Sequence, residues 1–152
     1  MPKISDIISF KRDLFFGGAV QISWFETDPE RRDQAASNFV FHGPEYHGVS
    51  EEDIESPTAF SLVDTVRFTG EILNALDPET ENKNPFALSI AGWGTGKSHL
   101  GLTLAALFSD THSDVSEDIL SNIEAADAQL GREIRDNLRS WNILFWCFPL
   151  TA

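Results

Sequence analysis

The sequence predicts an α/β fold, and three stretches of the chain support this prediction. Residues 86–90 (FALSI) have the length and composition of a short buried strand, and a glycine-rich turn at 91–96 leads into an apolar helix over 97–108. A continuous apolar run at 143–148 suits a central parallel strand that is buried on both faces. We therefore expect a parallel sheet with flanking helices, preceded by a small α+β region.

The glycine-rich turn has the pattern of a phosphate-binding loop. Residues 91–98 match G-x-x-x-x-G-K-[ST] at every position except the first, where Ala91 replaces glycine. Gly92, Gly94 and Gly96 allow the backbone dihedral angles that turn successive N–H groups toward an anion. The helix that follows adds the positive end of its dipole. The motif and its context predict a P-loop NTPase core, although an incomplete one.

Two side chains of this motif provide the expected chemistry. Lys97 supplies a positive charge for the outer phosphates and is the expected catalytic residue, and the Ser98 hydroxyl can join the coordination shell of Mg²⁺. The expected cofactors are therefore ATP and Mg²⁺, although the loop itself reads phosphates and not the base. Trp93 could stack on a ligand, but it could equally lie in the core or on the surface. The expected nucleotide-binding residues are Ala91, Gly92, Trp93, Gly94, Thr95, Gly96, Lys97, Ser98 and His99.

The composition is that of a folded domain with an acidic surface. The chain has 152 residues, of which 41% are hydrophobic and 11% aromatic. Its net charge of −13 comes without a long basic stripe, which argues against a direct nucleic-acid surface. The acidic excess serves solubility or meets a basic partner surface. No apolar run approaches the ~18 residues of a membrane helix, and the single Cys147 can form no internal disulfide, so we expect a cytoplasmic protein.

The first part of the chain contains two strand candidates. Residues 19–25 alternate between apolar and polar side chains, and residues 38–42 form a second short apolar run, so we expect an antiparallel pair. Between them, Asp28 and Pro29 mark a turn or the start of a short helix over 30–36. His42 and His47 match no zinc-ligand spacing, which favours an ordinary loop over a metal site. We assign residues 1–60 to an N-terminal α+β region and residues 61–152 to a partial nucleotide-binding domain.

Two further helices are predicted around the motif. Apolar residues at helical spacing predict an amphipathic helix over 61–76, in which Ser61 and Asp64 resemble a capping box. The same periodicity predicts one long amphipathic helix or two short ones over 115–139, with Gly131 as a point where it could bend.

The last apolar run limits what the motif can do alone. A P-loop ATPase needs an acidic residue at the tip of a neighbouring strand, yet residues 143–148 are followed by Pro149 and Leu150. We expect the N-terminal piece of a larger ATPase, a truncated copy of one, or a sheet that a partner chain completes. Two functions stay open: an ATPase module that is completed elsewhere, or a nucleotide-binding regulatory or interaction fragment without turnover.

The motif also resembles known families. Residues 94–100 (GTGKSHL) resemble the P-loop of AAA+-type ATPases, and the Lys-Ser-His-Leu step is similar to that of helicase loaders and initiators related to DnaA and IstB. The longer arrangement, a preamble over residues 1–85 and then GWGTGKSHL, resembles the start of large bacterial ATPases of phage-defence and DNA-modification islands, such as BREX-type systems. This resemblance implies an ATPase that works with methyltransferase, nuclease or other defence subunits. It also allows an oligomer, since AAA+-type modules often form rings.

Overall fold

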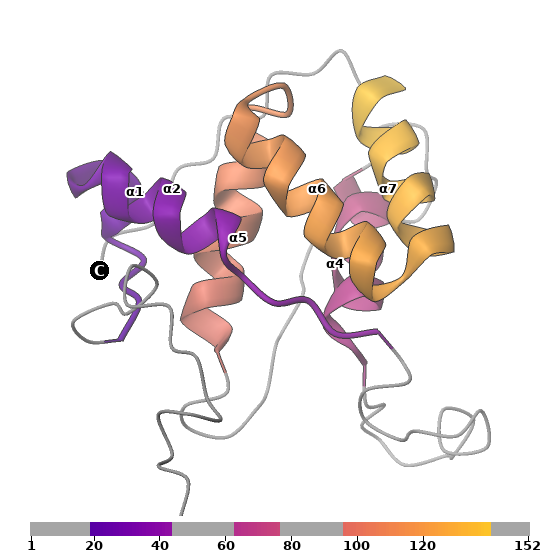
Figure 1. Ribbon diagram of the computed structural model, residues 1–152, viewed down its shortest axis with the longest axis horizontal. Helices are drawn as coiled ribbons and strands as arrows, with labels where there is room; N and C mark the ends of the chain where they lie inside the picture. The colour runs from indigo at the N-terminus through magenta and orange to yellow at the C-terminus, as the bar shows by residue number, and fades with distance from the viewer. Residues whose placement is uncertain (1–18, 44–62, 77–95, 141–152) are drawn as a thin grey trace, which may run out of the picture.

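The computed structural model describes residues 19–43, 63–76 and 96–140 of the chain (Figure 1). The predicted strands at 86–90 and 143–148 lie outside these residues. Helices make up 76% of the described part. They are α1 (Trp24–Thr27), α2 (Pro29–Ser37), α4 (Thr65–Leu76), α5 (Lys97–Ser109), α6 (Asp114–Ala126) and α7 (Ala128–Ser140).

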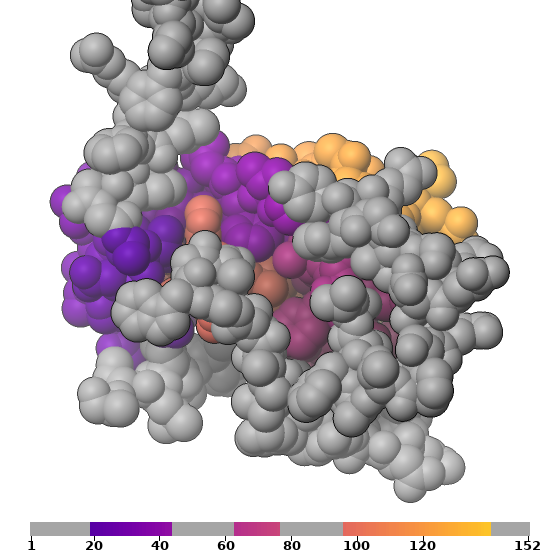
Figure 2. Space-filling model, turned by 90° about the horizontal axis from the view of Figure 1, so that it is seen from below, coloured from indigo at the N-terminus to yellow at the C-terminus, as the bar shows by residue number. Residues whose placement is uncertain are grey.

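Helix α5 lies at the centre of the described part. α1 and α2 pack on one side of it, α6 on another, and α7 joins α6 to α4 (Figure 1). Figure 2, seen from below, shows atoms of α5 between the indigo and purple atoms of the α1–α2 region and the magenta atoms of α4. Because neighbours surround it, α5 is apolar around most of its circumference. Its buried hydrophobic residues are Leu100, Leu102, Leu104, Ala106, Leu107 and Phe108.

A hydrophobic core joins segments that are distant in the sequence. Phe39 and Phe41, which come from the predicted N-terminal region, share one buried cluster with Leu104 of α5. The α6–α7 hairpin contributes Ile119, Leu120, Ile123, Ile134 and Leu138 to the same cluster. The division of the chain at residue 60 stays a prediction, but residues on both sides of it share this core.

The predicted α/β class is wrong for the part of the chain that the structure describes. Within residues 19–43, 63–76 and 96–140 there is no strand and no sheet, and the fold of this part is all-helical. The antiparallel pair that we expected in the N-terminal region is therefore also wrong. The two segments that were predicted as strands deviate for different physical reasons.

Residues 19–25 alternate in sequence but not in burial. A strand would place Val20, Ile22 and Trp24 on one face, yet the exposed fraction is 49% for Ile22 and 8% for Trp24. Instead, Trp24 begins α1 and packs with Ala35 and Leu102 in a small cluster. A short alternating run is ambiguous, and packing against α5 determines its conformation.

Residues 39–43 are extended but have no strand partner among the described residues. The period of two is present, because Phe39 and Phe41 are buried while Val40 is 67% exposed. The backbone groups of His42 bond to the start of α4: its N–H donates to Thr65 Oγ1 over 2.7 Å, and its carbonyl accepts from the Val66 N–H over 3.4 Å. A helix N-terminus thus takes the place of a neighbouring strand.

The predicted helices around these segments are confirmed. α2 begins after Asp28, whose carboxylate accepts from the Arg31 N–H over 3.1 Å, and Pro29 occupies the first turn. The described part of α4 reaches Leu76, and the helix begins at Thr65, because Asp64 itself caps it by accepting from the Arg67 N–H. Ser61, the other half of the predicted capping box, lies outside the described residues.

The predicted helix over 115–139 forms as two helices with a break at Asp127. The Asp127 carboxylate accepts from the N–H groups of Gln129 and Leu130, so it caps α7. Gly131 does not bend the chain at its own position. A Cβ there would lie 2.7 Å from the Cα atom of Glu124, so glycine permits the close approach of α6 and α7.

No helix among the described residues has the length and apolar character to cross a membrane.

Candidate functional site

The candidate site lies at the start of α5. Gly96 directly precedes the helix and has φ 80° and ψ 11°, in the left-handed region. Glycine adopts this conformation without the steric cost that a Cβ brings. The Gly96 carbonyl then accepts from the Leu100 N–H over 2.8 Å and so begins the helix. The helix starts at Lys97, as the motif predicts.

The start of α5 differs from the starts of the other long helices in the described part. α2, α4, α6 and α7 each begin with an acidic or hydroxyl side chain that accepts from an N–H group of the first turn. These capping residues are Asp28, Asp64, Ser113 and Asp127. Gly96 has no side chain, so it provides no such cap to α5. The first turn of α5 therefore has the positive end of a helix dipole without a capping carboxylate or hydroxyl from the residue before it.

The motif residues of the first turn divide between solvent and core. Lys97 and Ser98 are exposed, while His99 is half-buried and Leu100 is buried. The residues that carry the charge and the hydroxyl of the motif are thus solvent-accessible. The structure brings together the last four residues of the predicted site, from Gly96 to His99. The other five, Ala91, Gly92, Trp93, Gly94 and Thr95, lie outside the described residues.

His99 contacts α2 and the segment after it. Its Nε2 atom lies 2.7 Å from the carbonyl oxygen of Ala35. A carbonyl oxygen only accepts, so Nε2 carries the proton and donates. The imidazole also packs edge-on against the Phe39 ring, with 4.9 Å between the ring centroids. The motif includes His99 in the site, but no local signal predicts a contact with a residue so distant in the sequence.

Ser98 could contribute a hydroxyl to the coordination of Mg²⁺. An exposed hydroxyl in the first turn of a helix fits the role of one oxygen ligand among phosphate and water oxygens. The described residues contain no group of three or more His, Cys, Asp and Glu side chains that could hold a metal ion by themselves.

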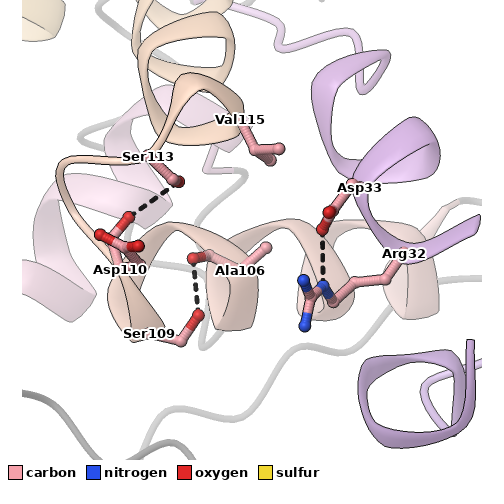
Figure 3. A pocket seen from close by; sticks show the side chains of 7 residues that line it. All are labelled: Arg32, Asp33, Ala106, Ser109, Asp110, Ser113 and Val115. Atoms are coloured by element: carbon pink, nitrogen blue, oxygen red, sulfur yellow. Dashed lines mark hydrogen bonds and ion pairs between the residues drawn. The ribbon is translucent and has the colours of Figure 1, made fainter. Parts of the chain in front are cut away.

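The pocket in Figure 3 lies at the other end of α5. It has a volume of about 80 Å³ and is lined by Arg32, Asp33, Ala106, Ser109, Asp110, Ser113 and Val115. Ligand pockets usually measure roughly 300 Å³ or more, so this one is too small for a nucleotide. The Arg32 guanidinium within it pairs with Asp33 over 2.6 Å.

The described ion pairs of the α6–α7 hairpin serve its stability. Arg135 bonds to Glu124 and Glu117, and Arg139 bonds to Glu117. Hydrogen bonds from Arg139 and Arg135 lower the pKa of Glu117 below its ordinary value of 4.5. Burial acts to lower the pKa of Arg135, but the bonds from Glu124 and Glu117 outweigh it and raise that pKa. These charges connect α6 to α7, and the motif residues are not among them.

No protein-family model, curated protein or solved structure matches this chain.

Proposed function

We propose that this chain binds ATP with Mg²⁺ through residues 91–99. Lys97 meets the outer phosphates and Ser98 contributes a hydroxyl to the metal ion. The chain then acts as the nucleotide-binding part of a cytoplasmic ATPase that works in DNA transactions or phage defence. Hydrolysis requires an acidic residue that the motif does not contain. The proposal concerns the loop and the helix start, and it does not depend on a parallel sheet in the described part.

The observation that supports this proposal is the left-handed glycine at the start of α5. Gly96 adopts a left-handed conformation and provides no capping side chain, whereas the other long helices in the described part have one. A backbone that alternates right- and left-handed conformations forms an anion-binding concavity, and a helix N-terminus adds its dipole to it. Lys97 and Ser98 follow at once and are exposed. These are the groups that a triphosphate requires.

Bound Mg²⁺ would neutralise part of the charge on the phosphate oxygens. The residues of the chain have separate tasks in this binding. The N–H groups of the first turn would orient the phosphates, and the Lys97 ammonium would hold the outermost one. Lys97 is a point charge on a flexible stem, so it can follow the phosphate without a fixed geometry.

Calorimetric titration of the full chain with Mg·ATP tests the proposal. We expect wild-type binding, and we expect Lys97→Ala to weaken it about ten- to a hundredfold, because it removes a charge-assisted hydrogen bond. Arg132→Ala is the matched control: Arg132 is also an exposed basic residue, but it lies on α7. Both variants should keep the wild-type unfolding temperature. Equal binding by the Lys97 and Arg132 variants would overturn the proposal.

A further inference from the structure

We propose that His99 couples nucleotide binding at the start of α5 to the segment Ala35–His42. This inference rests on the proposed function and adds a regulatory route to the same site. In it, His99 is a positioning residue: its ring acts on α2, while its neighbours Lys97 and Ser98 meet the ligand. Residues 35–42 form the linking segment.

The first step of the coupling is the bond from His99 to α2. The carbonyl groups in the last turn of a helix have no partner within that helix. The Ala35 carbonyl lies in the last turn of α2, where it accepts from the Asn38 N–H over 3.3 Å and from His99 Nε2 over 2.7 Å. The imidazole therefore helps to cap the C-terminus of α2, as a basic side chain can at a helix end.

The second step is the rigid attachment of His99 to the phosphate-binding turn. The backbone carbonyl of His99 accepts from Thr103 Oγ1 over 2.9 Å, and Thr103 is fully buried. Lys97 and Ser98 belong to the same turn of α5. A ligand that orders this turn consequently also fixes the position from which His99 reaches Ala35.

The third step is the set of contacts that the linking segment makes with other helices. The Asn122 side chain of α6 donates to the carbonyls of Ser37 and Phe39, over 2.8 and 3.4 Å. His42 bonds to the start of α4 through Thr65 and Val66. The linking segment therefore connects α5 to both α4 and α6. A change at the nucleotide site has a route to two helices that carry no motif residue.

Coupling of this kind is reciprocal. If bound nucleotide stabilises the His99–Ala35 contact, that contact must raise nucleotide affinity by the same factor. Typical coupling factors begin at about fivefold. Loss of the contact should accordingly weaken nucleotide binding by about this factor and should remove the effect of nucleotide on the linking segment.

Hydrogen exchange of the full chain, with and without Mg·ATP, tests this inference on a matched pair of variants. His99→Gln places an amide nitrogen near the position of Nε2 and so keeps the hydrogen-bond donor. His99→Asn introduces the same amide group, but its shorter side chain cannot place the nitrogen there. We expect nucleotide to increase protection over residues 35–42 in the wild type and in His99→Gln. We expect His99→Asn to bind about fivefold more weakly and to show no such increase.

Asn122→Ala separates coupling from simple stability. It removes a support of the linking segment without touching the motif, so it should lower protection in the absence of nucleotide but keep the nucleotide-dependent increase. Wild-type binding without added protection over 35–42, or an unchanged increase in His99→Asn, would overturn the coupling and leave the proposed function intact. Absence of Mg·ATP binding by the wild type would overturn both.

Discussion

The start of α5 and the α6–α7 hairpin belong to the same helical part of the chain, but they are stabilised in different ways. The hairpin supplies its own partners: Asp127 caps α7, and Arg135 bonds to Glu117 and Glu124. The start of α5 has a left-handed glycine, no cap from that residue and an exposed lysine. Departures from local stability rules in folded proteins are expected at functional sites. The hairpin is thus held by its own contacts, whereas the start of α5 is the place where we propose that a ligand binds.

Among glycine-to-alanine substitutions, we expect the largest change in the free energy of unfolding in the hairpin. A Cβ at Gly131 would meet the Cα and N atoms of Glu124 at 2.7 and 2.9 Å, so α6 and α7 must separate. We expect Gly131→Ala to lower the free energy of unfolding by about 1–3 kcal/mol, measured by chemical denaturation. Mg·ATP affinity in the folded variant should be unchanged.

Gly101→Ala is the matched control within a helix. No atom lies within 4 Å of a Cβ at this exposed position of α5, so alanine should raise stability by about 0.5–1 kcal/mol. If Gly131→Ala and Gly101→Ala changed the free energy of unfolding in the same direction, close packing would not be the reason for the glycine at position 131.

At the start of α5, the same substitution should have a smaller effect on stability and a larger one on binding. A Cβ at Gly96 meets nothing within 4 Å, but φ is 80°, so the cost is that of a left-handed alanine, about 1 kcal/mol. Relief of this strain would move Gly96 away from the left-handed conformation on which the proposed anion binding depends. We therefore expect Gly96→Ala to weaken Mg·ATP binding in calorimetry, and a variant more stable than wild type would contradict the left-handed conformation.

Acid should have the smallest of these effects, and the lowered pKa of Glu117 places it in the hairpin. The pKa of Glu117 is lowered in the folded chain by Arg139 and Arg135, so its contribution is present above about pH 4.5 and is lost as the pH falls through the lowered value. Because the Glu117 side chain is 43% exposed and solvent screens its charge, we expect less than about 1 kcal/mol. Glu117→Gln should reduce the difference in unfolding temperature between neutral and acidic pH. If the unfolding temperature of the wild type and of Glu117→Gln fell equally between neutral and acidic pH, the bonds of Glu117 to Arg135 and Arg139 would not contribute to stability.

Local signals in the sequence predicted the helices but not the fold class. Asp28 and Pro29 specify the start of α2, and the glycine–lysine step specifies the start of α5, because each acts through its own neighbours. The alternation over 19–25 fits a strand equally well, and only the packing of Trp24 against Leu102 decides for a helix. Such a contact depends on the folded core, which a short sequence pattern cannot specify.

The candidate site shows the same division. The motif identifies Lys97 and Ser98, and the structure exposes both at the predicted helix start. The motif does not predict that His99 caps α2, because the bond joins residues 64 positions apart. Residues 38–42, predicted as a strand, show the alternating burial of one, yet the backbone of His42 bonds to the start of α4 and not to a strand.

Residue-specific amide chemical shifts during a Mg·ATP titration test the central claim most directly. The account predicts the largest shifts at the amides of Gly96 to Leu100, smaller shifts over the linking segment, and little change in α7. Lys97→Ala should remove the shifts at the start of α5. Saturating shifts confined to other helices, or no shifts in the wild type, would contradict the claim that the start of α5 binds the phosphates.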